Sequence, residues 1–143
     1  MIVKDLHKGD ILSILEVFKD NFPDGWNENM LNSAFNGGRF LCLGAEDNGA
    51  LLGVITVSIG IDDADIEGVV IKKAFLRRGI GKLLVKSALD QIKDRNIEKV
   101  FLEVREGNFP AKNLYESFGF KPVSVRKKYY EDGENAIVMV KEL

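Results

Sequence analysis

Cysteine and histidine are nearly absent from this sequence, which has one of each among 143 residues. Because Cys42 is the only thiol, an internal disulfide and a thiolate zinc cluster are both excluded. A Ser-His-Asp or Cys-His triad would have to use His7, which lies in a polar stretch and is better interpreted as a solvated surface residue. Acid–base chemistry should therefore depend on carboxylates, tyrosines or lysines. We expect no metal site.

Long apolar runs and an excess of positive charge are also missing. No run approaches the roughly 20 apolar residues that a membrane-spanning helix needs, and residues 1–5 lack the apolar stretch of a secretory signal. The net charge of −2 creates no basic field that would attract nucleic acid. We therefore expect a cytoplasmic protein with neither a membrane nor a nucleic-acid partner.

The composition is that of an ordinary globular protein, with 45% hydrophobic and 29% charged residues. Its length fits a single domain over residues 1–143. The spacing of apolar residues predicts strands over 2–4, 40–45, 51–57, 64–71, 99–104, 120–125 and 136–140, and helices over 10–18, 27–35, 80–96 and 110–119.

Turn signals separate these elements. Residues 22–25 (Phe-Pro-Asp-Gly) are predicted to end the first helix, and Asp47-Asn48-Gly49 to form a hairpin turn. Pro110 suits the first position of the last helix. The order indicates an α+β domain with a mixed, mostly antiparallel sheet of about six to seven strands and about four helices on both faces.

A glycine-rich turn, residues 78–82, joins a predicted strand to the longest predicted helix. The first backbone N–H groups of a helix have no partner inside it and carry the positive end of the helix dipole. Glycines at 79 and 81 would let a ligand approach the backbone closely. The turn therefore predicts an anion site suited to a pyrophosphate. The alternative is a turn that only permits tight helix packing.

Two other phosphate motifs do not fit this turn. A P-loop requires Ser or Thr after the Gly-Lys pair, whereas Lys82 is followed by Leu83. The dinucleotide fingerprint requires a third glycine where this chain has Leu84.

The turn and the segment after Lys99 resemble the GNAT superfamily of acyl-CoA-dependent acetyltransferases. The phosphate signature of that family is Gln or Arg, two residues, Gly, one residue, and Gly or Ala. The chain matches it at Gly79 and Gly81, but Leu76 replaces the first residue and Lys73 replaces the usual preceding proline. The departure removes a side-chain hydrogen bond and leaves the backbone donors.

A narrower resemblance, to the ribosomal-protein-alanine N-acetyltransferases, rests on the C-terminal third. It covers residues 102–108 (Leu-Glu-Val-Arg-Glu-Gly-Asn) and 114–120 (Leu-Tyr-Glu-Ser-Phe-Gly-Phe), and continues through Arg126, Tyr129-Tyr130, Asp132-Gly133-Glu134, Ala136 and Met139. Phe22-Pro23 and Trp26 are similar to the same group.

The resemblance implies transfer of an acetyl group from acetyl-CoA to a primary amine, such as the N-terminal α-amine of a ribosomal protein. We expect a monomer or homodimer. The resemblance also implies roles for residues of this chain. The main chain of Val69, Val70 and Ile71 would pair with the pantetheine arm, Glu103 would be the general base and Tyr115 the general acid. The remaining cofactor contacts implied are Arg77, Arg78, Gly79, Ile80, Gly81, Lys82 and Asn108.

The chemistry suits these residue types. A free α-amine has an ordinary pKa near 8, about 2.4 units below that of lysine, so one carboxylate could suffice to deprotonate it. A half-buried carboxylate in the apolar run 100–104 would be an effective base, although plain strand alternation would instead place Glu103 on a solvated face. Glu67 is a rival base, on the strand where many superfamily members carry their carboxylate. Tyr115 could donate a proton to sulfur, or be a core aromatic residue.

Other interpretations stay open. The acceptor could be a small amine such as a polyamine, an amino acid or a drug. The chain could bind acetyl-CoA without turnover, or be a structural domain with an accidental glycine turn. Arg126, Tyr129 and Tyr130 could shape the slot for a peptide N-terminus, with Phe22 and Trp26 on the opposite wall or in the packing.

Overall fold

The computed structural model describes residues 1–19 and 26–143, and the predicted break at 22–25 lies outside them. The strands are β1 (Ile2–Asp5), β2 (Phe40–Asp47), β3 (Ala50–Ile59), β4 (Asp63–Ile71), β5 (Lys99–Arg105), β6 (Lys121–Arg126) and β7 (Ala136–Glu142). The helices are α1 (Ile11–Phe18), α2 (Glu28–Gly37), α3 (Ile80–Lys93) and α4 (Phe109–Ser117), with short 3-10 turns η1 (Lys8–Asp10) and η2 (Lys73–Phe75). The predicted order of helices and strands is confirmed.

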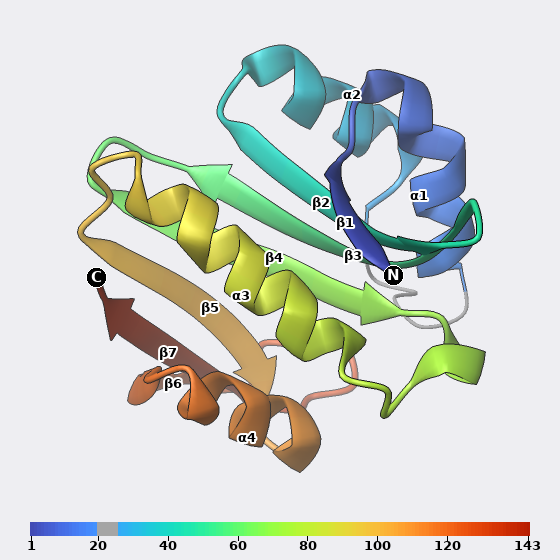
Figure 1. Cartoon of the computed structure of the whole chain (residues 1–143). Helices are drawn as coiled ribbons and strands as arrows, with labels where there is room; N and C mark the ends of the chain where they lie inside the picture. The colour runs from blue at the N-terminus through green and yellow to red at the C-terminus, as the bar shows by residue number, and fades with distance from the viewer. Residues whose placement is uncertain (20–25) are drawn as a thin grey trace.

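The seven strands form one sheet in the order β1-β2-β3-β4-β5-β7-β6 (Figure 1). Every neighbouring pair is antiparallel except β4 and β5, which are parallel. Helices α3 and α4 cover one face, and α1 and α2 cover the other (Figure 1). The predicted α+β class, with a mixed, mostly antiparallel sheet and helices on both faces, is confirmed. No helix among residues 1–19 and 26–143 is long and apolar enough to cross a membrane.

Local signals explain most of the element ends. Asn48 and Gly49 both have positive φ, 51° and 81°, as a two-residue hairpin turn between β2 and β3 requires. Asn96, the predicted stop of the long helix, has φ 59°, and the helix itself ends earlier, at Lys93. Helix α4 begins one residue before Pro110, because the side chain of Asn108 caps it by accepting the N–H of Ala111.

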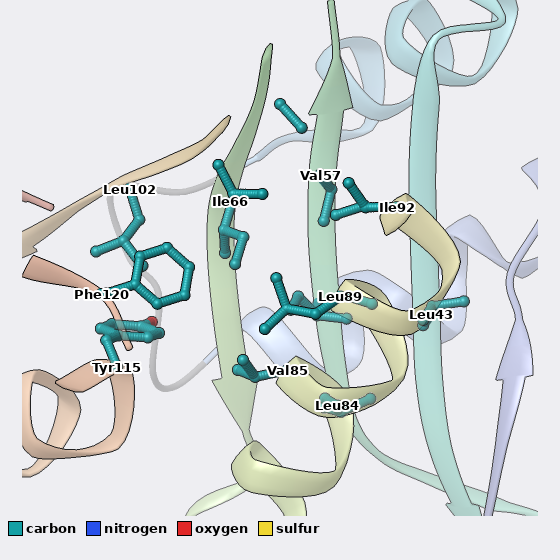
Figure 2. Close-up of a cluster of buried hydrophobic side chains, with 14 of the residues drawn as sticks. Leu43, Val57, Ile66, Leu84, Val85, Leu89, Ile92, Leu102, Tyr115 and Phe120 are labelled. Carbon is teal, nitrogen blue, oxygen red and sulfur yellow. The ribbon is translucent and has the colours of Figure 1, made fainter. Parts of the chain in front are cut away.

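Two apolar clusters, one on each face of the sheet, form the core. The cluster under α3 and α4 includes Leu84, Ile92 and Phe120 (Figure 2), and the cluster under α1 and α2 includes Cys42 and Val54. Burial raises the pKa of the Cys42 thiol to about 12. This only cysteine is therefore a packing residue and not a nucleophile.

The first turn of α3 lies close against the sheet because β3 has no side chain at Gly53. A Cβ at that position would lie 2.7 Å from Cδ1 of Ile71 and 3.1 Å from Cγ2 of Ile80. The glycine thus permits the contact that places the start of α3 next to the end of β4.

Candidate functional site

The parallel strands β4 and β5 separate at their carboxyl ends. They pair only over 63–66 and 99–102, although β4 continues to Ile71 and β5 to Arg105 (Figure 1). Beyond that point β4 stays paired with β3, and β5 stays paired with β7. We call the separation between β4 and β5 the opening. It lies at the carboxyl ends of the parallel strands, where sheets of mixed topology usually bind ligands.

The main chain of β4 presents hydrogen-bonding groups to this opening. The N–H of Lys72 donates to the carbonyl of Leu52 at 2.9 Å, and the register pairs Val70 with Val54. Along an antiparallel strand, the main-chain N–H and C=O groups of successive residues point alternately to one side and the other. Those of Val70 therefore point toward β3, while those of Val69 and Ile71 point toward the β5 side. Of the three residues predicted to pair with the pantetheine arm, two therefore face the opening through their main chain.

The glycine turn leads into α3 beside the opening. Arg77 and Gly79 have positive φ, 63° and 78°, and Gly79 is the N-cap of α3. The first intrahelical hydrogen bond, from the N–H of Leu83 to the carbonyl of Gly79 (3.1 Å), leaves the amides of Ile80, Gly81 and Lys82 outside the helical ladder.

The space over this turn is open. A Cβ on Gly79 would meet no atom within 4 Å, and the side chains of Arg77, Arg78 and Lys82 are exposed around it. Gly81 lies where α3 meets β4 and α4, because a Cβ there would lie 3.5 Å from Cδ2 of Leu114 and 3.9 Å from Cγ1 of Val69. The arrangement fits a diphosphate at the turn that continues into the opening.

Glu103 lies on β5 beyond the last residue paired with β4. Val100, Leu102 and Val104 join the cluster under α3 and α4, so the alternation of the strand places Glu103 on the opposite face. Its side chain is 30% exposed, with Oε1 3.6 Å from Nε of Arg126. Its Oε2 is buried and has no hydrogen-bond partner among the described residues. A buried oxygen of this kind is free to accept a proton from a ligand.

Tyr115 lies on α4, on the other face of the sheet. It is 8% exposed and its ring contacts Phe120 edge-on at 5.9 Å, in the cluster that also holds Ile66 and Leu102 (Figure 2). Burial raises the pKa of its phenol to about 12, so the hydroxyl is protonated at neutral pH. Glu103 and Tyr115 thus belong to opposite faces of the divided sheet.

Glu67 lies at an irregularity of β4. Thr56 pairs with Gly68 and Val57 with Ile66, so Glu67 has no cross-strand partner. It is exposed and accepts a hydrogen bond from the hydroxyl of Ser58. It therefore lies close to the opening but one strand away from Glu103.

A second carboxylate shares the face of Glu103. Ala64 and Ile66 belong to the cluster under α3 and α4, which places Asp65 on the opposite face. Burial, and then the charges of Asp63 and Glu103, raise the pKa of Asp65. This side of the opening is therefore acidic and suits a cationic amine.

The segment between β6 and β7 lies beside Glu103, on the same side of the opening. The phenol of Tyr129 lies near Glu103, whose carboxylate raises the pKa of Tyr129. Arg105 contacts Asp132, Glu134 and the ring of Tyr130. Sequence reasoning did not assign a role to Arg105; its place two residues after Glu103 on the same strand was the available signal.

The sequence suggested Trp26 and Phe22 either as a wall of the slot for a peptide N-terminus or as packing residues. Trp26 packs against Phe40 at 5.3 Å between ring centroids, beside the cluster under α1 and α2. Phe22 lies outside the described residues. The contact of Trp26 supports a packing role.

Known proteins are similar to this chain in sequence and in fold. A family model described as the acetyltransferase (GNAT) family matches residues 11–120. The ribosomal protein bS18-alanine N-acetyltransferase of Escherichia coli is 32% identical over 121 residues, which are 82% of this chain and 80% of that protein.

Solved structures agree. The ribosomal-protein-S18-alanine N-acetyltransferase from Escherichia coli has a TM-score of 0.91 at 27% identity, covering 99% of this chain and 92% of that chain. NAA60 of Arabidopsis thaliana, solved in complex with acetyl-CoA, has a TM-score of 0.88 at 17% identity, covering 99% of this chain and 98% of that chain, and shows the shared fold alone. The protein therefore belongs to the acetyltransferase (GNAT) family and is an N-acetyltransferase.

Proposed function

We propose that the protein transfers the acetyl group of acetyl-CoA to the N-terminal α-amine of a polypeptide, such as a ribosomal protein. The observation that carries this proposal is the opening between β4 and β5, which has the anion site of α3 on one side and Glu103 on the other. The relatives named for alanine N-acetylation support this class of acceptor.

Residues on the α3 side would hold the cofactor, which supplies the activated acetyl group. The main chain of Val69 and Ile71 would pair with the pantetheine amides, as a strand pairs with its neighbour. The amides of residues 80–82, with Arg77, Arg78 and Lys82, would bind the diphosphate. Asn108 caps α4 through its Oδ1 and would contact the cofactor through its side-chain nitrogen.

Residues on both faces would move the protons. Glu103 would accept the proton of the ammonium group, directly or through one water. Tyr115, protonated at neutral pH because burial raises its pKa to about 12, would donate a proton to the departing thiolate sulfur. Holding both reactants in one narrow opening would supply much of the remaining rate.

A thiol-release assay tests this function. The purified protein is incubated with acetyl-CoA and an alanine-initiated peptide, the same peptide with a blocked N-terminus, and a panel of polyamines, amino acids and amine drugs. Because Cys42 is buried with a pKa raised to about 12, a thiol reagent at neutral pH should report only the released CoA. We expect release with the free peptide and none with the blocked one, with mass spectrometry locating the acetyl group on the α-amine.

The rival functions give different results in the same assay. Release with small amines alone would establish a small-molecule acetyltransferase. CoA binding without release over the whole panel would establish a sensor. A thermal melt tests the third alternative. CoA at 100 times its dissociation constant should stabilise the protein by about 2.7 kcal/mol, and no stabilisation at all would indicate a structural domain.

Gly81→Val tests the cofactor geometry. The new side chain would extend from the first turn of α3 toward Leu114 and Val69 and fill the route between the turn and the opening. We expect CoA to bind at least about tenfold more weakly, a change of about 1.4 kcal/mol by titration calorimetry.

The matched control is Gly81→Ala, whose Cβ would make only ordinary contacts at 3.5 and 3.9 Å. Neither residue has a lower helix propensity than glycine, so both variants should melt near the temperature of the parent protein. Unaltered CoA affinity in a folded Gly81→Val protein would refute this path for the cofactor.

Three further expectations stay predictions. Residues 1–143 are expected to form one acetyltransferase domain, to work in the cytoplasm and to do so as a monomer or homodimer. Sedimentation of the purified protein with and without CoA would decide between a monomer and a homodimer.

A further inference from the structure

The residues between β6 and β7, 127–135 (the 127–135 loop), bring a tyrosine to the carboxylate of Glu103. Tyr129 interacts with Glu103 through its phenol, and its ring contacts Tyr130 edge-on at 5.1 Å. Arg126, the residue before the loop, lies 3.6 Å from the same carboxylate. The conformation of the loop therefore decides which groups surround Glu103.

Apolar burial does not hold this loop. None of residues 127–135 is buried, and Tyr129 is 49% exposed. A segment with little buried apolar surface opens easily unless polar contacts restrain it. Polar contacts must therefore supply the restraint. One is the main-chain hydrogen bond from the N–H of Glu106 to the carbonyl of Asn135 at 3.0 Å, and the others involve side chains.

Arg105 makes the central contacts. Its Nη1 donates to Oδ2 of Asp132 at 2.8 Å and to Oε1 of Glu134 at 3.0 Å, and its guanidinium lies over the ring of Tyr130, 4.0 Å from the centroid. Because Arg105 and Glu103 are two residues apart on β5, both side chains leave the same face of one strand. One rigid strand thus carries both the carboxylate and the anchor of the loop.

Further hydrogen bonds depend on the same acidic residues. Oε2 of Glu134 accepts the N–H of Gly107 at 2.9 Å, and Oδ1 of Asp132 accepts the N–H of Glu134 at 3.0 Å. The pKa of Arg105 is raised, first by its hydrogen bond to Glu134, and the pKa of Asp132 is lowered, first by the backbone N–H of Glu134 and then by Arg105. The charges are therefore arranged as a network and not as one isolated surface pair.

We propose that Arg105 is a positioning residue for acetyl transfer: it holds the 127–135 loop against β5 so that Tyr129 and Arg126 confine the amine acceptor at Glu103. The proposal rests on the proposed function for its effect on the acceptor. Its structural part, the restraint of the loop, stands independently. Lysine is a poor substitute, because it lacks the planar guanidinium that stacks on the ring of Tyr130 while one of its nitrogens, Nη1, contacts both carboxylates.

Kinetics test the effect on the acceptor. In Arg105→Gln we expect kcat/KM for the peptide to fall by about tenfold or more, mainly through a higher KM for the peptide, since small displacements of positioning groups are costly. The KM for acetyl-CoA should change less than twofold, and Arg105→Lys should recover little. Arg95→Gln, an exposed arginine after α3, is the matched control and should behave as the parent protein.

Limited proteolysis tests the restraint itself without turnover. Trypsin should cleave after Arg126, Lys127 and Lys128 at least about fivefold faster in Arg105→Gln than in Arg95→Gln. Asp132→Asn should show a smaller increase, because Glu134 still binds the guanidinium.

The outcomes separate the two claims. No transfer by the parent protein to any peptide would overturn the proposed function, while unchanged cleavage in Arg105→Gln would overturn the restraint. Transfer by the parent protein with an unchanged peptide KM in Arg105→Gln would overturn the positioning role. Equal increases in the KM for peptide and acetyl-CoA would show general damage to the site and would also overturn it.

Discussion

Replacing Glu103 by glutamine should lower kcat/KM for the acceptor peptide by about a hundredfold or more, because a positioned general base typically contributes 10²–10⁴ in rate, about 3–5 kcal/mol of barrier. The carboxamide keeps the shape of the side chain but cannot take up the proton of the ammonium group. Oε2 of Glu103 is buried and lacks a partner among the described residues, so it is available for that proton. CoA affinity should stay within twofold, since the proposed cofactor residues lie on β4, in the turn and first residues of α3, and at Asn108 before α4.

The pH dependence of this variant is a second readout. The ordinary pKa of an α-amine is near 8. As the pH rises through that value, more of the peptide is already neutral, and the loss of the base should matter less. The defect of Glu103→Gln should therefore shrink between about pH 7 and pH 9 in initial-rate measurements.

Glu67→Gln is the matched control for Glu103→Gln. Glu67 is an exposed carboxylate on the adjacent strand, bonded to Ser58, and its loss should cost less than about threefold. If Glu67→Gln lost more activity than Glu103→Gln, the assignment of the base would move to Glu67. Lost CoA binding in Glu103→Gln would instead indicate a folding defect.

Tyr115→Phe should lower kcat by about a hundredfold, at the low end of the range for acid–base groups. A thiol has an ordinary pKa near 8.5, so a thiolate leaves without much help and the acid contributes less than the base. Phenylalanine keeps the ring contact with Phe120 and removes only the hydroxyl. An unchanged kcat would show that water protonates the sulfur and that Tyr115 is a packing residue.

The same variant should change stability at alkaline pH. The phenol titrates near 10 in the unfolded chain and at about 12 in the folded protein, because burial disfavours the phenolate. A raised folded-state pKa means that this contribution is complete below pH 10 and is lost as the pH rises toward 12. Two pKa units correspond to about 2–3 kcal/mol.

Denaturant titrations at several pH values check the direction of this change in the free energy of unfolding. The parent protein should lose about 2–3 kcal/mol more of its free energy of unfolding than Tyr115→Phe between pH 9.5 and 12. Cys42, whose pKa is also raised to about 12, contributes equally to both proteins and cancels in the comparison. Parallel curves would mean that the phenol is hydrated in the folded state.

Much of the architecture and part of the site could be predicted from the sequence because the signals are local. The spacing of apolar residues along α3, the Asn48-Gly49 pair and the cap of α4 at Asn108 each act within a few residues. The glycine turn at the start of α3 is equally local, since unpaired amides follow from the beginning of any helix.

The arrangement around the opening depends on contacts between distant segments. Pairing of β4 with β5 stops at Ile66 and Leu102, and no pattern within either strand marks that residue. Strand alternation restricts Glu103 to one of two faces, but only the packing of β5 under α3 and α4 decides which face it is.

The sequence by itself determined the order of the helices and strands, their apolar faces and the unpaired main-chain amides at the start of α3, because those depend on neighbours along the chain. The tertiary structure alone decided the separation of β4 from β5, the placement of Glu103 and Tyr115 on opposite faces, and the contact of Arg105 with Asp132 and Glu134. The physical reason is that these features depend on contacts between separate elements, such as those of Arg105 with Asp132 and Glu134, which are 27 and 29 residues away. Their geometry follows from strand register and core packing.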